Sequence, residues 1–137
     1  MTIATDKYLL DTCICIHFLQ KRKEVIEHIR TVGWENCCIA EVTIGELLCG
    51  IREDGRKARN VDVISQFVAD IQVVPTSLGI REFAAQKRRL GNMGLLIEDF
   101  DLLIGSTAVA ENCILVTENV AHMGRLERVR IENWVIR

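Results

Sequence analysis

Short apolar runs alternate along the chain with longer segments in which apolar residues recur at helical spacing. Each of the short runs is bounded by polar residues, which is the pattern of strands buried in a sheet. The strands predicted in this way are residues 8–10, 37–40, 71–74, 113–116 and 131–135. Pro75, the only proline, should end the third strand because it has no N–H to donate to a sheet.

Between these runs lie apolar sets spaced as on one face of a helix. The sets are Ile14, Phe18 and Leu19; Val25, Ile26, Ile29 and Val32; Ile44, Leu47, Leu48 and Ile51; Val61, Ile64, Phe67 and Val68; Ile80, Phe83 and Ala84; and Leu102, Leu103, Ile104, Ala108 and Val109. The last set covers a wide arc, so its helix should be the most buried. Repeated alternation of strand and helix predicts an α/β three-layer fold, with a central, mostly parallel five-stranded sheet flanked by helices.

The length and composition fit one folded domain over residues 1–137. The chain is 49% hydrophobic and 26% charged, which is typical of globular proteins and argues against disorder. Its apolar stretches are far shorter than the roughly 20 residues needed to span a bilayer. Residues 1–7 do not resemble a signal peptide, so we expect a cytoplasmic protein with no membrane partner.

Six cysteines and three histidines raise the possibility of disulfides or a zinc site. The cysteines mostly fall within apolar runs, where cysteine behaves as a small hydrophobe. No Cys-x-x-Cys pair occurs, and the histidines are scattered. The pattern therefore favours reduced, structural thiols and gives no zinc signature.

Four acidic residues stand where predicted strands end or a helix begins. Asp11 follows the first strand, Glu46 lies in the helix after the second, and Asp99 and Asp101 open the most apolar helix. Because the carboxyl ends of parallel strands meet at one edge of a sheet, these carboxylates should converge there. Crowded carboxylates repel one another unless a cation lies between them, and hard oxygen donors suit Mg²⁺ or Mn²⁺. The residues thus predict a metal-dependent phosphodiesterase.

Each acid also has an ordinary structural interpretation. Asp11 could cap the helix that follows it, and Glu46 could face solvent. One of Asp99 and Asp101 could cap its helix or interact with the helix dipole. Residues two apart on a helix point in different directions, so Asp99 and Asp101 can share one ion only if Asp99 precedes the helix proper.

Five sequence blocks resemble, in order, the signatures of PIN-domain ribonucleases, and most closely those of VapC toxins. The blocks are Leu9-Leu10-Asp11-Thr12-Cys13, Thr43-Ile44-Gly45-Glu46-Leu47-Leu48-Cys49-Gly50, Asp99-Phe100-Asp101-Leu102-Leu103-Ile104-Gly105, Leu115-Val116-Thr117-Glu118-Asn119 and Ile131-Glu132-Asn133-Trp134. The resemblance spans about residues 8–135. No block is specific alone, but five in order are hard to obtain by chance.

The resemblance implies an endoribonuclease that uses Mg²⁺ or Mn²⁺ and acts as the toxin of a type II toxin–antitoxin pair. Asp11, Glu46, Asp99 and Asp101 would be catalytic, with the metal held by Asp11, Asp101 and Asp99. Residues expected to support these acids or the substrate are Thr12, Thr117 and Asn119. The implied partners are RNA as substrate, a cognate antitoxin and a second copy in a homodimer, with operator DNA bound only through the antitoxin.

The fourth block departs from the family pattern. Many relatives carry an acid at the place of Asn119 or of His122, whereas neither position is acidic here. Asn119 supplies an amide without charge, which leaves the number of metals open between one and two. His122 could replace the missing acid.

The net charge of −2 is unusual for a protein that binds nucleic acid. Its basic residues nevertheless bunch in three groups, which could contact RNA or simply be solvated surface: Arg52, Arg56, Lys57 and Arg59; Lys87, Arg88 and Arg89; Arg125, Arg128 and Arg130.

Two other functions remain open at this point. The missing fourth acid would fit a PIN-like subunit with weak catalysis that regulates DNA together with an antitoxin. A phosphate-accepting signalling domain also collects acids at a sheet edge, but it would need an aspartate after the third strand. Pro75 and Thr76 stand there instead, so the sequence disfavours this class.

Overall fold

The computed structural model describes residues 5–51 and 56–137. At its centre five parallel strands form one sheet in the order β3-β2-β1-β4-β5. The strands are β1 (Tyr8–Leu10), β2 (Cys37–Ala40), β3 (Gln72–Val74), β4 (Ile114–Val116) and β5 (Ile131–Glu132). The α/β fold class predicted from the sequence is therefore confirmed, and every pairing in the sheet is parallel.

The last strand is shorter than the predicted 131–135. After Glu132 the Asn133 side chain accepts a hydrogen bond from the backbone N–H of Val135 at 3.0 Å, which turns the chain out of the ladder. Trp134 is buried there and packs on Tyr8, with ring centroids 5.5 Å apart. This segment was apolar enough to suggest a strand because it belongs to the core.

The six predicted helices are all present: α1 (Thr12–Leu19), α2 (Lys23–Val32), α3 (Glu41–Cys49), α4 (Lys57–Asp70), α5 (Ile80–Asn92) and α6 (Asp99–Ala110). Three short elements were not predicted: α7 (Val120–Met123) and the 3-10 helices η1 (Trp34–Asn36) and η2 (Thr76–Leu78). In α6 six residues are buried, more than in any other described helix, as its apolar arc predicted.

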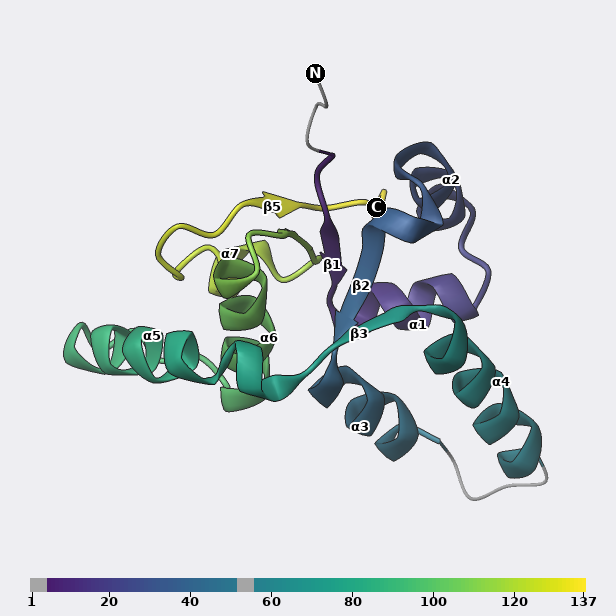
Figure 1. Cartoon of the computed structure of the whole chain (residues 1–137), viewed down its shortest axis with the longest axis horizontal. Coiled ribbons are helices and arrows are strands. Elements are labelled where there is room, and N and C mark those ends of the chain that lie inside the picture. The colour runs from purple at the N-terminus through teal and green to yellow at the C-terminus, as the bar shows by residue number, and fades with distance from the viewer. Residues whose placement is uncertain (1–4, 52–55) are drawn as a thin grey trace.

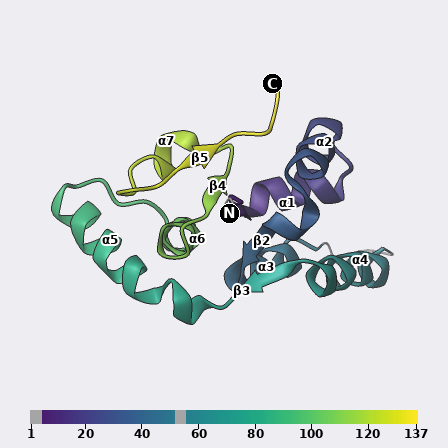
Figure 2. The ribbon, with the colours of Figure 1, turned by 45° about the horizontal axis from the view of Figure 1, so that its top comes forward.

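Alternating strand residues build two cores on the two faces of the sheet. Leu10 and Ile39 pack with α1, α2, α3 and α4 on one face, and Leu9 and Leu115 pack with α5, α6 and α7 on the other. Figures 1 and 2 show α1, α2 and α4 on one side of the strands and α5, α6 and α7 on the other. The two cores therefore lie on opposite faces of one sheet.

Among the described residues, no helix is both long enough and apolar enough to cross a membrane.

Candidate active site

Three elements that follow neighbouring strands meet at the carboxyl edge of the sheet. Asp11 follows β1 and begins α1, Glu46 lies on α3 after β2, and the turn of residues 117–119 follows β4. The first turn of α6, with Asp101, packs beside them. The sheet order places β2, β1 and β4 side by side, so the convergence expected from parallel topology occurs here.

Asp11 is buried, only 5% exposed, and both of its carboxylate oxygens are hydrogen-bonded. Oδ1 accepts a bond from the backbone N–H of Thr12 at 2.8 Å, and Oδ2 accepts one from the hydroxyl of Thr117 at 2.7 Å. Burial raises the pKa of Asp11, while the bonds from Thr117 and Thr12 act in the opposite direction because they stabilise the charged form. Asp11 is thus the N-cap of α1, as its structural interpretation predicted, and it also faces the acids of the site.

Glu46 is held towards Asp11 by Thr12. The Thr12 hydroxyl donates to Glu46 Oε1 at 2.6 Å, and its oxygen also lies 3.2 Å from the hydroxyl oxygen of Thr43. Glu46 is only partly exposed, so the alternative in which it simply faces solvent is wrong. Thr12 therefore joins the two acids: its backbone binds Asp11 and its side chain binds Glu46.

Asp101 lacks the strong hydrogen bonds that Asp11 has. The Asn119 amide donates to Asp101 Oδ2 over a long 3.4 Å, and the backbone N–H of Asn119 is bonded to Thr117 Oγ1 at 3.0 Å. Burial, followed by the negative charges of Asp11, Glu98 and Glu46, raises the pKa of Asp101 from 3.8 to about 6, against a small opposing effect of His122. The negative charge at Asp101 is the least compensated in the site.

Asp99 lies in a different environment from the other predicted acids. It is the first residue of α6, and Lys87 Nζ lies 2.9 Å from its Oδ1, with the Asp99 side chain 59% exposed. Glu98 occupies the N-cap position without a side-chain cap bond, so neither Asp99 nor Asp101 caps this helix. Since Asp99 lies inside the helix, the condition for sharing an ion with Asp101 is not met, and the structure does not bring these two side chains together.

Several residues of the site were not predicted. Glu98 adds charge near Asp101, and the buried Thr43 supports Thr12. The acidic run Glu98-Asp99-Phe100-Asp101 was a visible signal for the first, whereas Thr43 is hidden in an apolar helix. Glu118 is contacted by His17 and Arg137, which are remote in sequence, so no local pattern could have shown this link.

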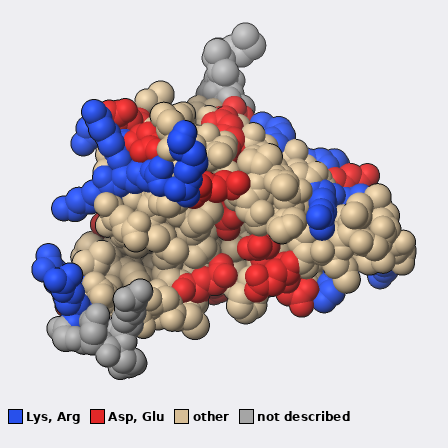
Figure 3. All heavy atoms as spheres, turned by 180° about the vertical axis from the view of Figure 1, so that it is seen from behind, with Lys and Arg blue, Asp and Glu red and all other residues tan. Residues whose placement is uncertain are grey.

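A groove adjoins the acids between α1, α3 and α4. Its volume is about 380 Å³, and its lining includes Ile16, Leu19, Glu46 and Val63. Figure 3 shows this face of the molecule, where a hollow lies beside a band of acidic side chains and basic side chains flank the band on both sides. The candidate site is therefore an open, acidic surface next to an apolar groove.

The donor chemistry at this edge fits a hard divalent cation. Asp11, Glu46 and Asp101 offer carboxylate oxygens, and the raised pKa of Asp101 shows negative charge that a cation would offset. In the described part of the chain, no three Asp, Glu, His or Cys side chains are already arranged around one ion position. A shared ion would therefore require side-chain rotation, for which the partly exposed Asp101 has room.

Comparison with known proteins agrees with this geometry. Residues 8–128 match the family described as PIN domain. Ribonuclease VapC2 of Haemophilus influenzae is 30% identical over 130 residues, covering 94% of this chain and 98% of the relative. The tRNA(fMet)-specific endonuclease VapC of Shigella flexneri is 30% identical over 129 residues, covering 93% and 98%.

Solved structures show the same fold. The DNA-bound VapBC of Salmonella typhimurium superimposes with a TM-score of 0.87 at 24% identity, covering 95% of this chain and 99% of that one. VapBC2 of Rickettsia felis, bound to a promoter DNA fragment, gives 0.84 at 26% identity, covering 93% and 98%. With the family match and the relatives at 30% identity, these findings show that the chain belongs to the PIN-domain family.

Proposed function

We propose that this chain is a divalent-metal-dependent endoribonuclease and the toxin of a toxin–antitoxin pair, acting in the cytoplasm as a single PIN domain. The observation that carries the proposal is the meeting of Asp11, Glu46 and Asp101 at one sheet edge, with Asp101 left electrostatically uncompensated. The VapC relatives, named as ribonucleases or as an endonuclease, support RNA as the substrate.

The acids would have different roles in the reaction. Asp11 and Asp101 would hold Mg²⁺ or Mn²⁺, which offsets charge on the phosphodiester and promotes ionisation of the attacking water. Glu46, fixed by Thr12, is suited to accept a proton from that water. Thr117 holds Asp11 and Asn119 holds Asp101. The predicted role of Asp99 as a ligand would require it to release Lys87.

The partners follow from the relatives' complexes. VapBC assemblies have been solved with DNA, so we propose a cognate antitoxin for this chain, with operator DNA contacted through the antitoxin. The homodimer implied by the family resemblance is part of the same proposal.

The direct test is cleavage of a structured RNA pool with and without Mg²⁺, by the parent chain and by Asp101→Asn. We expect cleavage only with the metal, and a loss of about 100-fold or more in the variant, because removing one preorganised charged group from such a site costs at least that much. A thermal melt of both proteins controls for folding. Cleavage that persists in chelator, or in the folded variant at the parent rate, would contradict the proposal.

A regulatory subunit with weak catalysis is the second candidate, and Asn119 favours it. Asn119 supplies an uncharged amide where the family resemblance implies an acid. This candidate predicts slow RNA cleavage at saturating metal and DNA binding by the chain only together with its antitoxin. A cleavage rate at the level of the VapC relatives, measured in parallel, would exclude it.

A further inference from the structure

An acidic site repels the RNA backbone, so a substrate strand needs positive contacts close by. Of the three basic groups noted in the sequence, Arg52 lies outside the described residues. The second group supplies Lys87, which is paired with Asp99, two residues before Asp101. A further basic residue, Arg137, is paired with Glu118, the residue between Thr117 and Asn119. Each cation is thus attached to an acid adjacent to the site.

Arg137 is held in a fixed orientation but remains accessible. Glu118 Oε2 accepts bonds from Arg137 Nε at 3.0 Å and from Nη2 at 2.6 Å, while His17 Nε2 lies 2.5 Å from the other oxygen, Oε1. The Arg137 side chain is still 68% exposed. A guanidinium carries five N–H donors, and those on Nη1 take no part in the contact with Glu118.

Lys87 has a similar arrangement on the other element. Its Nζ lies 2.9 Å from Asp99 Oδ1 and 5.8 Å from the centre of the Phe83 ring, and the side chain is 44% exposed. An ammonium has three N–H donors, so the bond to Asp99 leaves capacity for a further acceptor. Asp99 and the Phe83 ring therefore position the Lys87 ammonium and leave N–H donors available for a phosphate.

The two cations are held by two different elements, whose neighbouring residues Asp101 and Asn119 contact each other. Asp99 precedes Asp101 on α6, whereas Glu118 precedes Asn119 on the turn after β4. An RNA strand that crosses Asp101 would find one positive group anchored at the start of α6 and another anchored at the turn after β4.

The pairing acids do not prevent these cations from binding phosphate. Exposed ion pairs are weak and are screened by salt, and a charged donor can serve a carboxylate and a phosphate together. Holding a long side chain in place also lowers the entropy that it loses when substrate binds.

We propose that Arg137 and Lys87 bind phosphates of the RNA strand on either side of Asp101. The acids Glu118 and Asp99 position them, which gives Asp99 a role outside metal ligation. This inference rests on the proposed ribonuclease function and identifies how that site would hold its substrate.

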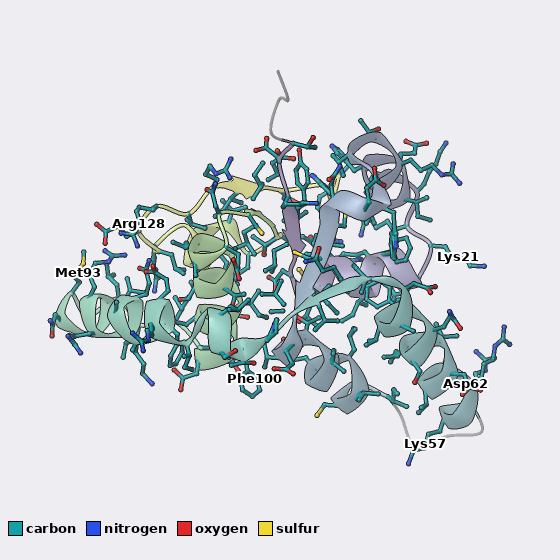
Figure 4. All side chains as sticks on the ribbon, in the orientation of Figure 1. Lys21, Lys57, Asp62, Met93, Phe100 and Arg128 are labelled. Atoms are coloured by element: carbon teal, nitrogen blue, oxygen red, sulfur yellow. The ribbon has the colours of Figure 1, made fainter. Side chains whose placement is uncertain are left out.

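The test measures the binding of a fluorescein-labelled single-stranded RNA by anisotropy across a salt series, with the full chain carrying Asp11→Asn so that RNA is not cut. Arg137→Gln and Lys87→Gln are compared with Arg128→Gln. Arg128 is a matched control because it is 62% exposed, is paired with Glu82 of α5, and lies away from Phe100 at the start of α6 (Figure 4). Removing one phosphate contact should lower the slope of log affinity against log salt by about 0.7 for a single strand.

We expect that loss of slope in both test variants, roughly twice that loss in the double variant, and none in Arg128→Gln. Parent slopes in Arg137→Gln and Lys87→Gln would overturn the inference and leave the two pairs as surface salt bridges. An equal loss in Arg128→Gln would also overturn it, because the effect would then reflect net charge alone. Failure of the parent chain to cleave RNA with Mg²⁺ would instead refute the ribonuclease proposal, so the two failures are distinguishable.

Discussion

The two halves of the candidate site stabilise negative charge in different ways. On one side, Asp11 is almost fully buried, yet both of its oxygens accept bonds, from the Thr12 backbone and the Thr117 hydroxyl. On the other side, Asp101 is less buried and has only the long contact from Asn119, and burial together with the charges of three acids raises its pKa to about 6. Burial raises the pKa of both acids, and the difference between them comes from the hydrogen bonds and the neighbouring charges.

This difference indicates a division of labour. The Asp11 half is built into the fold through the cap of α1 and the turn after β4, so it should be rigid and structurally important. In the other half, the negative charge on Asp101 is unfavourable in the folded chain. A bound cation should therefore stabilise this half of the site most strongly. Figure 4 shows Phe100, between Asp99 and Asp101, at the start of α6, and this side chain is 49% exposed.

The largest expected effect is loss of activity when either half loses its charge. Asp11→Asn and Asp101→Asn should each lower the RNA cleavage rate by about 100-fold or more, because an amide keeps the shape but removes the ligand charge. The measurement is cleavage of a sensitive RNA substrate at saturating Mg²⁺, with circular dichroism to verify folding. Full activity in either variant would show that the substituted acid is not part of the catalytic site.

A smaller effect should appear when the hydrogen bonds of the Asp11 half are removed. Thr117→Val deletes the donor to Asp11 Oδ2, so it should lower stability at neutral pH by about 1–3 kcal/mol and activity by about 10–100-fold. Thr31→Val is the control, since the exposed Thr31 hydroxyl bonds only its own helix at Glu27. If chemical denaturation gives the same stability for both variants, Asp11 does not depend on Thr117.

The Asp101 half predicts a stability change of the opposite sign. Its pKa is raised from 3.8 to about 6 on folding, so the folded state favours the protonated form. The stability from this group is present below about pH 4 and is lost as pH rises through about 6. Asp101→Asn should therefore stabilise the metal-free chain near pH 7, by about 1 kcal/mol once solvent screening is allowed for.

The response of the melting temperature to metal also distinguishes the Asp101 half from the Asp11 half. Adding Mg²⁺ or Mn²⁺ should raise the melting temperature of the parent chain, and Asp101→Asn should weaken that response, because the ion stabilises the folded state by mass action. Melting curves at several pH values, with and without metal, test both effects. If millimolar metal leaves the melting temperature of the parent chain unchanged, the result argues against a shared carboxylate site.

The smallest expected effect concerns the contact between the halves. Asn119 bonds Asp101 with its side chain and Thr117 with its backbone, so its amide faces the acids and not its own turn. Asn119→Asp should therefore strengthen metal binding and shift the cleavage-versus-Mg²⁺ curve to lower concentration by about threefold to tenfold, since an added carboxylate attracts a dication. Coincident titration curves for the two proteins would show that position 119 does not reach the ion.

The sequence predicted most of the fold because its signals are local. Strand runs and helical spacing marked five strands and six helices, and the wide apolar arc after Asp101 identified the most buried helix. Local patterns could not predict where a strand or helix ends when that end depends on a side-chain hydrogen bond. The early end of β5 before Asn133 is an example. The unpredicted α7 contains only four residues, too few to display a periodic pattern.

For the site, the sequence by itself predicted that Asp11, Glu46, Asp99 and Asp101 would meet at one edge, because a parallel sheet brings the ends of its strands together, and all of them except Asp99 do so. Only the tertiary structure decided what each acid touches. Asp99 and Asp101 are two residues apart, yet the helix turns one towards Lys87 and the other towards Asn119. The link from Arg137 through Glu118 to His17 joins residues from opposite ends of the chain, and such contacts exist only once the sheet has brought those ends together.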